Sequence, residues 1–248
     1  MKKNRRNLVL AILIMISLTI LLPVYAQDNK EAMLRKAKKL TWDKNYTEAI
    51  KIYQDFLSKY PKDKDALKMQ YKIGEWYMQL NDYEQAVKAF RELISQYPGS
   101  DFTIKAHHKI VDCYYRWGKY DEAIRESQEI INLYPDDERT PGKQAKIGHI
   151  YFKKKDYKRA LAAYQKVLDN YPDTKTARGI QSDIAEIYFE EGKFSQAIEE
   201  LKKVITSQSQ DTQIKASAYI FLARIYEEKG QIDKAVTSYK KAMETLPE

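Results

Sequence analysis

The fold is decided by residues 65–98, which read DALKMQYKIGEWYMQLNDYEQAVKAFRELISQYP. Apolar residues recur at helical spacing in the first half, and a similar stripe begins at Tyr83 in the second half. Asn81-Asp82 between the halves is typical of a tight turn. Pro98 ends the second helix, because proline cannot continue a helix. The stretch therefore predicts two antiparallel helices, here called the first and the second helix.

This pattern recurs along the chain with a period of 37 residues. The Tyr-Pro pair that closes it occurs at Tyr60-Pro61, Tyr97-Pro98, Tyr134-Pro135 and Tyr171-Pro172. A fixed period of this size indicates stacked copies of one small unit. We predict an all-α fold, a right-handed α-solenoid of about six antiparallel helix pairs. The predicted repeats are residues 31–61, 62–98, 99–135, 136–172, 173–209 and 210–248.

The first 26 residues differ from the rest in composition. Basic residues come first (Lys2, Lys3, Arg5, Arg6), and residues 8–22 are apolar except at two positions. This is the pattern of a secretory signal. The apolar run is shorter than the ~20 residues of a spanning helix, so cleavage is favoured over retention as an anchor. We expect residues 1–26 to be a signal peptide and residues 27–248 to form the mature solenoid.

The leader predicts an exported protein, either periplasmic or associated with the cell envelope, without a membrane span after cleavage. The only cysteine, Cys113, lies far from residue 27, so we expect neither a lipidated N-terminus nor an internal disulfide. Removing residues 1–26 lowers the formal net charge from +8 to +4. That charge is too small to indicate a nucleic-acid partner.

The repeats resemble the tetratricopeptide repeat. A small residue precedes a tyrosine by three positions on the first helix, as at Gly74 and Tyr77. An alanine precedes a bulky residue by four positions on the second helix, as at Ala86 and Phe90. The agreement extends over nearly the whole mature chain. The resemblance implies a superhelix whose first helices line a concave face and bind other proteins or extended peptides.

The family period is about 34 residues, so each repeat here has three more, which we expect in the loop after Tyr-Pro. Thr140, before Pro141, is predicted to cap a first helix. Gly74 and Gly148 share one repeat position, where close packing should offset the ~1 kcal/mol cost of a helical glycine. The spacing fails once, at the polar loop from Ser207 to Thr212, where we predict a change of superhelix angle.

Two loops, Tyr97-Pro98-Gly99-Ser100 and Tyr171-Pro172-Asp173-Thr174, resemble those of exported bacterial repeat proteins. One such protein is the lipoprotein of the outer-membrane barrel-assembly machinery. The other is the repeat domain of the Tol-Pal-associated cell-division coordinator. This chain lacks the lipid-bearing cysteine of the former and the coiled coil that precedes the repeats of the latter. The resemblance implies a role in assembly or maintenance of the cell envelope.

No motif indicates catalysis. His107 and His108 are neighbours, so they point about 100° apart on a helix and cannot chelate a metal as an i,i+4 pair does. His108 and His149 are expected on exposed sides of first helices, where solvated histidines are favoured over a weak metal site. Cys113 lies beside an apolar stripe and is expected to be a buried filler rather than a nucleophile. We predict a non-enzymatic protein with no catalytic residue, no cofactor and no metal.

The outward sides of the first helices form the candidate partner-binding surface. One repeat position carries what we call the ladder: Met78, Tyr115, Phe152 and Phe189. The charge on this side is basic in the second to fourth repeats and acidic in the last two. The predicted concave-face residues are Lys68, Lys72, Met78, Lys105, His108, Lys109, Tyr115, Arg116, Lys146, His149, Phe152, Lys153 and Phe189.

An apolar ladder flanked by cations suits an extended peptide with apolar and acidic groups. The alternative is that the ladder packs against the neighbouring helix and the charges are only solvated. The positions hold no asparagine, which the family's carboxylate-binding groove uses, so specific capture of a C-terminal carboxylate is not expected.

The leading hypothesis is thus an exported, non-catalytic scaffold that binds envelope proteins through its concave face. Two alternatives remain: a homo-oligomer built through its terminal helices, and a cell-wall or glycan-associated module.

Overall fold

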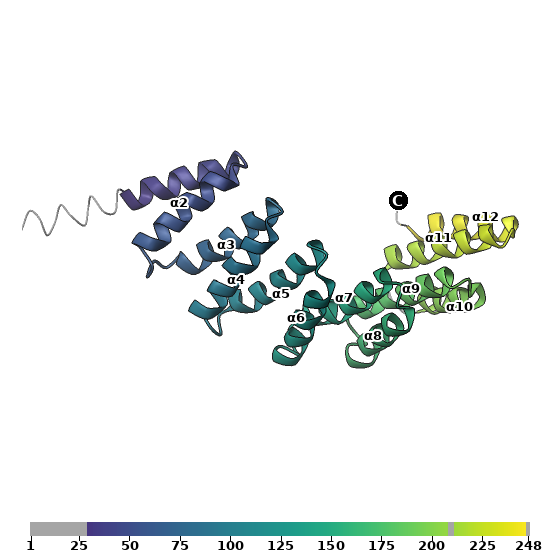
Figure 1. Cartoon of the computed structure of the whole chain (residues 1–248). Helices are drawn as coiled ribbons and strands as arrows, with labels where there is room; N and C mark the ends of the chain where they lie inside the picture. The colour runs from purple at the N-terminus through teal and green to yellow at the C-terminus, as the bar shows by residue number, and fades with distance from the viewer. Residues whose placement is uncertain (1–28, 208–210, 247–248) are drawn as a thin grey trace, which may run out of the picture. The chain divides into compact units, whose positions relative to one another are not determined.

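The computed structural model describes residues 29–207 and 211–246. Within these ranges the chain forms twelve helices and no strand (Figure 1). The predicted signal peptide at residues 1–26 lies outside the described residues, and so do residues 208–210 of the loop where the spacing fails. Signal cleavage and the change of superhelix angle therefore stay predictions.

First and second helices alternate along the chain, as the sequence predicts. The first helices are residues 29–42, α3 (Ala66–Gln79), α5 (Asp101–Arg116), α7 (Thr140–Lys153), α9 (Lys175–Glu190) and α11 (Thr212–Glu228). The second helices are α2 (Tyr46–Lys59), α4 (Tyr83–Gln96), α6 (Tyr120–Leu133), α8 (Tyr157–Asn170), α10 (Phe194–Thr206) and α12 (Ile232–Thr245). A turn of three residues joins each first helix to the second helix that follows it.

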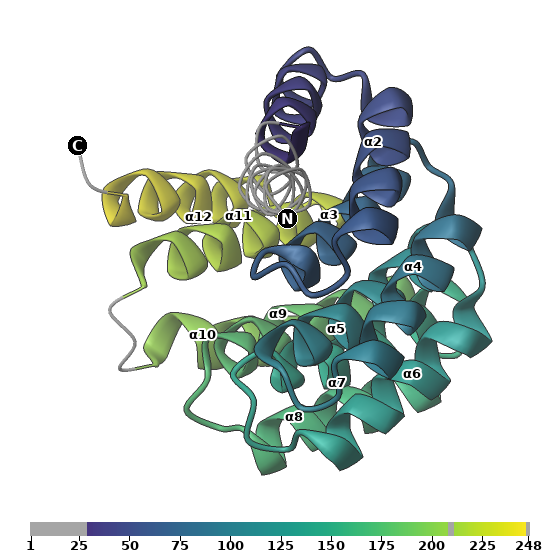
Figure 2. The ribbon, with the colours of Figure 1, turned by 90° about the vertical axis from the view of Figure 1, so that its left-hand side faces the viewer.

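The chain divides into two compact units. The N-terminal unit ends at Cys113 and contains helix 29–42, α2, α3, α4 and most of α5; helix 29–42 and α2 run antiparallel (Figure 2). The C-terminal unit begins at Tyr114, and its consecutive helices from α6 to α12 pack against one another. The all-α fold of stacked helix pairs is confirmed. The single continuous domain over residues 27–248 stays a prediction.

Within each unit, a second helix packs against the next first helix through the same apolar repeat positions. In the N-terminal unit this core contains Ile50, Tyr53, Phe56, Met69, Ile73 and Trp76, from α2 and α3. In the C-terminal unit α8 and α9 contribute Tyr164, Val167, Ile180, Ile184 and Ile187. Between α10 and α11 the core contains Leu201, Val204, Leu222 and Ile225. Because each buried side chain stabilises by ~1.5–3 kcal/mol, this stacking holds each unit together.

The tyrosine of each Tyr-Pro pair is the residue at which a second helix ends. Tyr60, Tyr97, Tyr134 and Tyr171 have φ between −129° and −137°. The proline ring that follows excludes the helical conformation from the residue before it. Each tyrosine N–H still donates to the carbonyl four residues back, at 2.8–2.9 Å. The pair therefore ends the helix while satisfying a carbonyl of its last turn.

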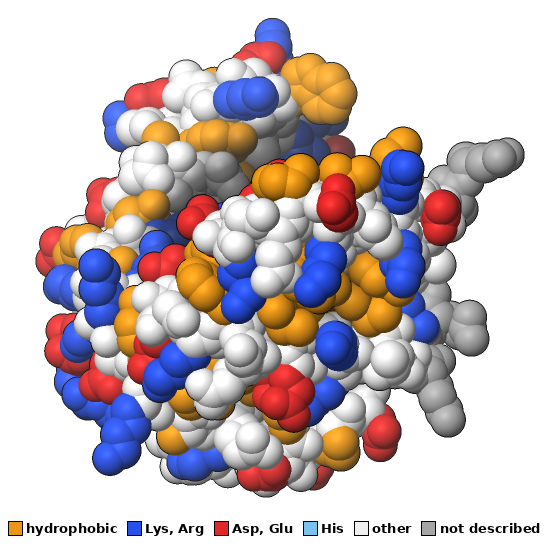
Figure 3. Space-filling view, turned by 90° about the vertical axis from the view of Figure 1, so that its right-hand side faces the viewer, with side chains coloured by type: hydrophobic (Ala, Val, Ile, Leu, Met, Phe, Trp, Pro, Cys, Tyr) orange, Lys and Arg blue, Asp and Glu red, His pale blue; other side chains and the backbone are white. Residues whose placement is uncertain are grey.

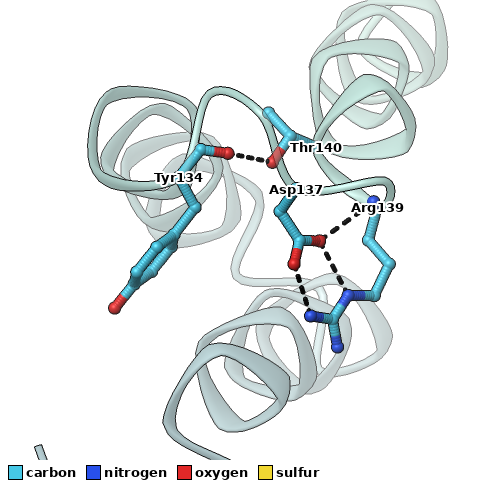
Figure 4. Close-up of polar contacts among 4 residues, drawn as sticks. All are labelled: Tyr134, Asp137, Arg139 and Thr140. Atoms are coloured by element: carbon cyan, nitrogen blue, oxygen red, sulfur yellow. Dashed lines mark hydrogen bonds and ion pairs between the residues drawn. The ribbon is translucent and has the colours of Figure 1, made fainter. Parts of the chain in front are cut away.

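Side-chain hydrogen bonds hold the loop after Tyr134 (Figure 4). The Thr140 hydroxyl donates to the Tyr134 carbonyl oxygen at 2.6 Å. Asp137 accepts from the Arg139 backbone N–H at 3.0 Å and from its guanidinium at 2.8 and 2.6 Å. The prediction that Thr140 caps α7 is wrong, because Thr140 is already the first helical residue and its hydroxyl bonds back to the preceding helix end.

The three extra residues per repeat are only partly in the loops. The loops at residues 60–65 and 134–139 have six residues, as expected for a lengthened connection. The loops at 97–100 and 171–174 are shorter, because α5 and α9 have 16 residues where α3 and α7 have 14. In those repeats part of the added length is helical.

Each three-residue turn contains one residue with a positive φ. These residues are Lys44, Asn81, Gly118, Lys155, Gly192 and Gly230, with φ from 58° to 78°. The N–H of the residue after each bonds to a carbonyl of the first helix, as from Asp156 to Tyr151 at 2.9 Å. This is the hydrogen bond of a Schellman motif, which favours glycine. The left-handed conformation costs other residues ~1–2 kcal/mol, so the lysine turns are strained.

We expect Lys155→Gly to raise the free energy of unfolding by ~1 kcal/mol, because glycine adopts the left-handed conformation freely. Gly192→Ala should lower it by a similar amount. Urea denaturation of both variants measures this. Lys154→Gly is the matched control, since Lys154 has a φ of −77° and gains nothing from glycine. Equal effects of Lys155→Gly and Lys154→Gly would contradict the interpretation.

Candidate functional site

Three ladder residues lie in the C-terminal unit, in the last turns of α5, α7 and α9. Each ring packs against the first residue of the following helix and is half-buried. The ring centroids are 5.8 Å apart for Tyr115 and Tyr120, 5.8 Å for Phe152 and Tyr157, and 5.6 Å for Phe189 and Phe194. The ladder therefore combines both alternatives: one part of each ring packs against the neighbouring helix and the rest is accessible.

Two lysines of α7 flank the Tyr115 ring. The Lys146 Nζ atom is 4.5 Å and the Lys153 Nζ atom 5.3 Å from its centroid. Each cation–π contact stabilises by ~0.5–1 kcal/mol at an accessible site. The contacts place two ammonium groups beside one aromatic surface, and this combination attracts a ligand that has both apolar and negative groups.

An aromatic residue that is not among the predicted site residues extends the ladder onto α11. The Phe221 ring lies 5.6 Å from the Phe189 ring, edge to face. The Arg224 guanidinium lies 5.5 Å from the Phe221 centroid and 5.9 Å from that of Phe189. Aligning the repeats could have found Phe221, because it takes the position that holds Lys146 and Asp183 in the preceding repeats.

The surface changes from basic to acidic between α7 and α9. His149 Nε2 lies 3.3 Å from the Asp183 carboxylate and joins the two helices. The pKa of Glu186 is raised by burial and then by the nearby carboxylates of Asp183 and Glu190, against the opposing charges of Arg224 and His149. Negative charge is thus concentrated on α9, next to the lysines of α7.

Glu75 pairs with two predicted site residues in the N-terminal unit. Its carboxylate lies 2.7 Å from the Lys72 Nζ atom and 3.1 Å from the Lys109 Nζ atom. Burial would raise the pKa of Glu75, but hydrogen bonds from both lysines outweigh it and the pKa is lowered. Lys68 and Lys105 are exposed, and Arg116 of the C-terminal unit is exposed as well.

We expect Glu75→Gln to lower the free energy of unfolding by ~1 kcal/mol at pH 7 and by much less at pH 3. A folded-state pKa below the unfolded value means that the pairing stabilises above the unfolded pKa of ~4.3 and is lost as pH falls through the folded value. Thermal unfolding at the two pH values measures the difference. Glu84→Gln is the control, because Glu84 is exposed and makes no ion pair within the described ranges. An effect of Glu75→Gln that does not depend on pH would contradict the assignment.

Two predicted site residues are buried, so their placement on the outward side is wrong. Met78 is 7% exposed and His108 is 5% exposed. The i,i+4 pattern assumes that each helix buries only a narrow stripe of side chains. In the structure α3 and α5 each bury side chains over a wide arc. The other buried residues of α5 are Thr103, Ala106, His107, Ile110, Val111 and Cys113. Cys113 is fully buried, as predicted for a filler.

Across residues 29–207 and 211–246, no group of three His, Cys, Asp or Glu side chains is placed to hold a metal ion. In the same part of the chain, no helix combines the length and the apolar character needed to cross a membrane.

A pocket of 730 Å³ lies beside Lys68 and Lys72, among helix 29–42, α2 and α3. Trp42 lines it and is 87% exposed, whereas Trp76 is 6% exposed. Neither tryptophan is among the site residues predicted from the sequence. Trp42 could have been found from the repeat alignment, because the same position holds Gln79, Arg116 and Lys153 in later repeats.

Comparison with protein families identifies the repeats. The tetratricopeptide repeat model matches residues 31–63, 69–100 and 105–137. The model of a tetratricopeptide repeat-like domain matches residues 144–246. No curated protein shows significant sequence similarity to the chain.

Several solved structures share the fold. The crystal structure of MamA has 22% sequence identity and a TM-score of 0.51, covering 70% of this chain and 94% of its own. A tetratricopeptide repeat protein from Parabacteroides merdae ATCC 43184 has 16% identity and a TM-score of 0.50, covering 88% and 93%. BtubC (BKLC) from P. vanneervenii has 14% identity and a TM-score of 0.59, covering 86% and 91%. At these identities the likeness shows the fold alone. Since repeat models match both compact units and the helices pair as the models require, the chain is a tetratricopeptide repeat protein.

Proposed function

We propose that the chain is an exported, non-catalytic scaffold that binds an extended acidic segment of another envelope protein along the first helices of its C-terminal unit. The tetratricopeptide repeat fold is that of a protein-interaction scaffold. Export is proposed from residues 1–26, and the envelope role from the resemblance of the Tyr-Pro loops. The observation that carries the binding proposal is the accessible Tyr115 ring with Lys146 and Lys153 beside it.

Open space near the N-terminal ends of α7 and α9 favours a peptide ligand. Gly142 and Gly179 take the repeat position that holds Lys68 and Lys105 in earlier repeats. A Cβ atom added at either glycine would meet nothing within 4 Å. A peptide backbone can therefore approach the first turns of α7 and α9 closely, while the half-buried rings of the ladder, in the last turns of the same helices, contact apolar side chains further along the peptide.

The charges on α7 and α9 favour one orientation of the segment. Carboxylates of the ligand are attracted to Lys146 and Lys153 on α7, and the acidic residues of α9 repel them. The acidic part of the segment therefore lies against Tyr115 and α7, and a neutral or basic part lies against α9.

Recovery of partners from envelope fractions tests this proposal. The Tyr115→Ala/Phe152→Ala variant should recover its partners much less than the wild type, because truncating two central aromatic anchors removes the main apolar contact. Lys146→Glu/Lys153→Glu should have the same effect through charge. Lys158→Glu/Lys166→Glu is the matched control, with two exposed lysines of α8. Equal recovery by the wild type and the two ladder variants would rule out this surface as the binding site.

Self-association is the second candidate function, and the surface of α12 favours it. Ile232, Val236 and Met243 are 60%, 47% and 76% exposed. On α2, Ile50 and Leu57 take the repeat positions of Val236 and Met243 and pack in the core next to α3. Figure 3 faces the side that bears α11 and α12 and shows hydrophobic side chains among lysines and arginines.

If α12 mediates self-association, light scattering should find an oligomer of the wild type that Val236→Lys/Met243→Lys converts to a monomer, because two buried charges oppose the contact. Thr237→Lys/Glu244→Lys is the control on the same helix, at exposed polar positions. A monomeric wild type at high concentration would exclude this candidate.

A further inference from the structure

We infer that the pocket of the N-terminal unit is a binding site for a bulky aromatic side chain carried by an acidic protein segment. The inference rests on the proposed function as a scaffold. It adds a second contact site, distinct from the ladder, that binds one aromatic side chain of a ligand. Shape, exposed aromatic surface and charge each contribute to it.

The pocket has an apolar floor of packed aromatic rings. Trp76 is held by Tyr53, whose ring centroid lies 4.9 Å away, and is stacked with Tyr46 at 6.4 Å. Leu34 and Met69 complete the apolar lining. The volume of 730 Å³ lies within the ~300–1,000 Å³ of ligand sites, so it holds an aromatic side chain together with its neighbours.

Trp42 supplies an exposed aromatic surface at the edge of this floor. Because Trp42 is 87% exposed, it adds little to the core of the unit. Tryptophan is the residue type most enriched among binding hot spots. An aromatic pair adds ~0.5–1.5 kcal/mol beyond the area that it buries, so an aromatic ligand side chain gains more here than an aliphatic one.

The charge around the pocket selects an acidic segment. Lys38, Lys44, Lys68 and Lys72 line it, against one acidic residue, Asp65. Lys72 pairs with Glu75, and the other three lysines make no ion pair within the part of the chain that the structure describes. Ammonium groups around an apolar floor attract carboxylates that flank the anchor side chain.

The same charge argues against a second copy of this chain as the occupant. The exposed apolar residues of α12, Ile232, Val236 and Met243, are a candidate for entering the pocket of a second copy. That helix carries three lysines, Lys234, Lys240 and Lys241, against two carboxylates, Asp233 and Glu244, so its net charge is positive like that of the pocket rim, and like charges at an interface oppose association. A partner segment with carboxylates beside its aromatic residue is therefore favoured.

Fluorescence anisotropy with labelled synthetic peptides tests the site. The probe is a short capped peptide of aspartate and glutamate with one central tryptophan. One comparison peptide has alanine at the centre, another has lysines in place of the acidic residues, and acetyl-tryptophan amide is the free side chain. We expect the acidic tryptophan peptide to bind at least ~10-fold more tightly than each of these, because anchor and flanking charges both contribute.

The variants divide the site into its parts. Trp42→Ala should weaken binding of the acidic tryptophan peptide ~10-fold or more, and Trp117→Ala, in the C-terminal unit, should not. Lys38→Glu and Lys68→Glu should weaken this binding. Lys39→Glu should not, because Lys39 is exposed on the same helix as Lys38 but lies outside the pocket. Circular dichroism verifies that each variant is folded, and Trp42→Tyr should retain part of the affinity.

Two results would overturn the inference: equal affinities of Trp42→Ala and Trp117→Ala, or equal binding of the tryptophan and alanine peptides. Acetyl-tryptophan amide binding as tightly as the peptide would overturn it too, since the site would then recognise a small molecule. Tyr115→Ala/Phe152→Ala separates this inference from the proposed function. If the acidic tryptophan peptide no longer binds Trp42→Ala but still binds Tyr115→Ala/Phe152→Ala, the pocket is its binding site. That conclusion holds even if the ladder binds no partner.

Discussion

Gly148→Ala is expected to lower the free energy of unfolding of the C-terminal unit by ~1–3 kcal/mol, the cost of overpacking a filled core. A Cβ atom at this position would lie 2.3 and 2.4 Å from two atoms of the Tyr164 ring. Tyr164 is 1% exposed and belongs to the core between α8 and α9, so the ring cannot move without opening that core. The clash should exceed the ~0.5–1 kcal/mol that alanine otherwise gains over glycine in a helix.

Gly179→Ala is the matched control for this prediction. Gly179 also lies inside a first helix, but a Cβ atom there would meet nothing within 4 Å. Gly179→Ala should therefore stabilise the C-terminal unit by up to ~1 kcal/mol. The next repeat combines Ala185 with Leu201 at the positions of Gly148 and Tyr164, so Gly148→Ala/Tyr164→Leu should recover part of the loss. Urea denaturation measures the free energy of unfolding of Gly148→Ala, Gly179→Ala and Gly148→Ala/Tyr164→Leu. A Gly148→Ala variant as stable as Gly179→Ala would contradict the close packing of Gly148 against Tyr164.

Trp76→Ala is expected to lower the free energy of unfolding of the N-terminal unit by ~3–5 kcal/mol, as large-to-small changes of buried aromatic residues do. Trp76 is 6% exposed and packs between α2 and α3, with the Tyr53 ring 4.9 Å away. Its loss leaves a cavity below the pocket that the backbone of two packed helices cannot close.

Trp42→Ala should change the same stability by less than ~0.5 kcal/mol, because an exposed side chain contributes little to the folded state. Thermal and urea unfolding of both variants thus separate a tryptophan that holds the unit together from one that is available for binding. A large destabilisation by Trp42→Ala would show that Trp42 is a structural residue and would weaken the case for the pocket as a site.

The helix pairs could be predicted from the sequence because their signals are local and repeated. Pro61 and its equivalents end second helices through the conformation of a single neighbouring residue. The small residue at Gly148 indicates a close approach from the next helix, and the Tyr164 ring is found there. These signals recur with a period of 37 residues. A pattern that arose by chance in one repeat would not recur at the same positions in the others.

The site could be predicted less well, because burial depends on elements distant in the sequence. Met78 and Phe152 share a repeat position, yet Met78 is buried and Phe152 is half-buried. The pocket beside Trp42 requires three helices at once, which no helical period within one segment reveals. Trp42 is an aromatic residue at a repeat position that is polar in later repeats. This difference indicates the pocket, and it is seen only when the repeats are aligned.

Site-specific photo-crosslinking in living cells tests the central claim most directly, that the first helices of the C-terminal unit bind a partner segment. A photoreactive phenylalanine analogue at Phe152 should form an adduct with another protein, and Lys146→Glu/Lys153→Glu should abolish that adduct. The same analogue at Lys166, exposed on the second helix α8, should form none. Adducts of equal yield from the two positions, or none from Phe152, would contradict the account.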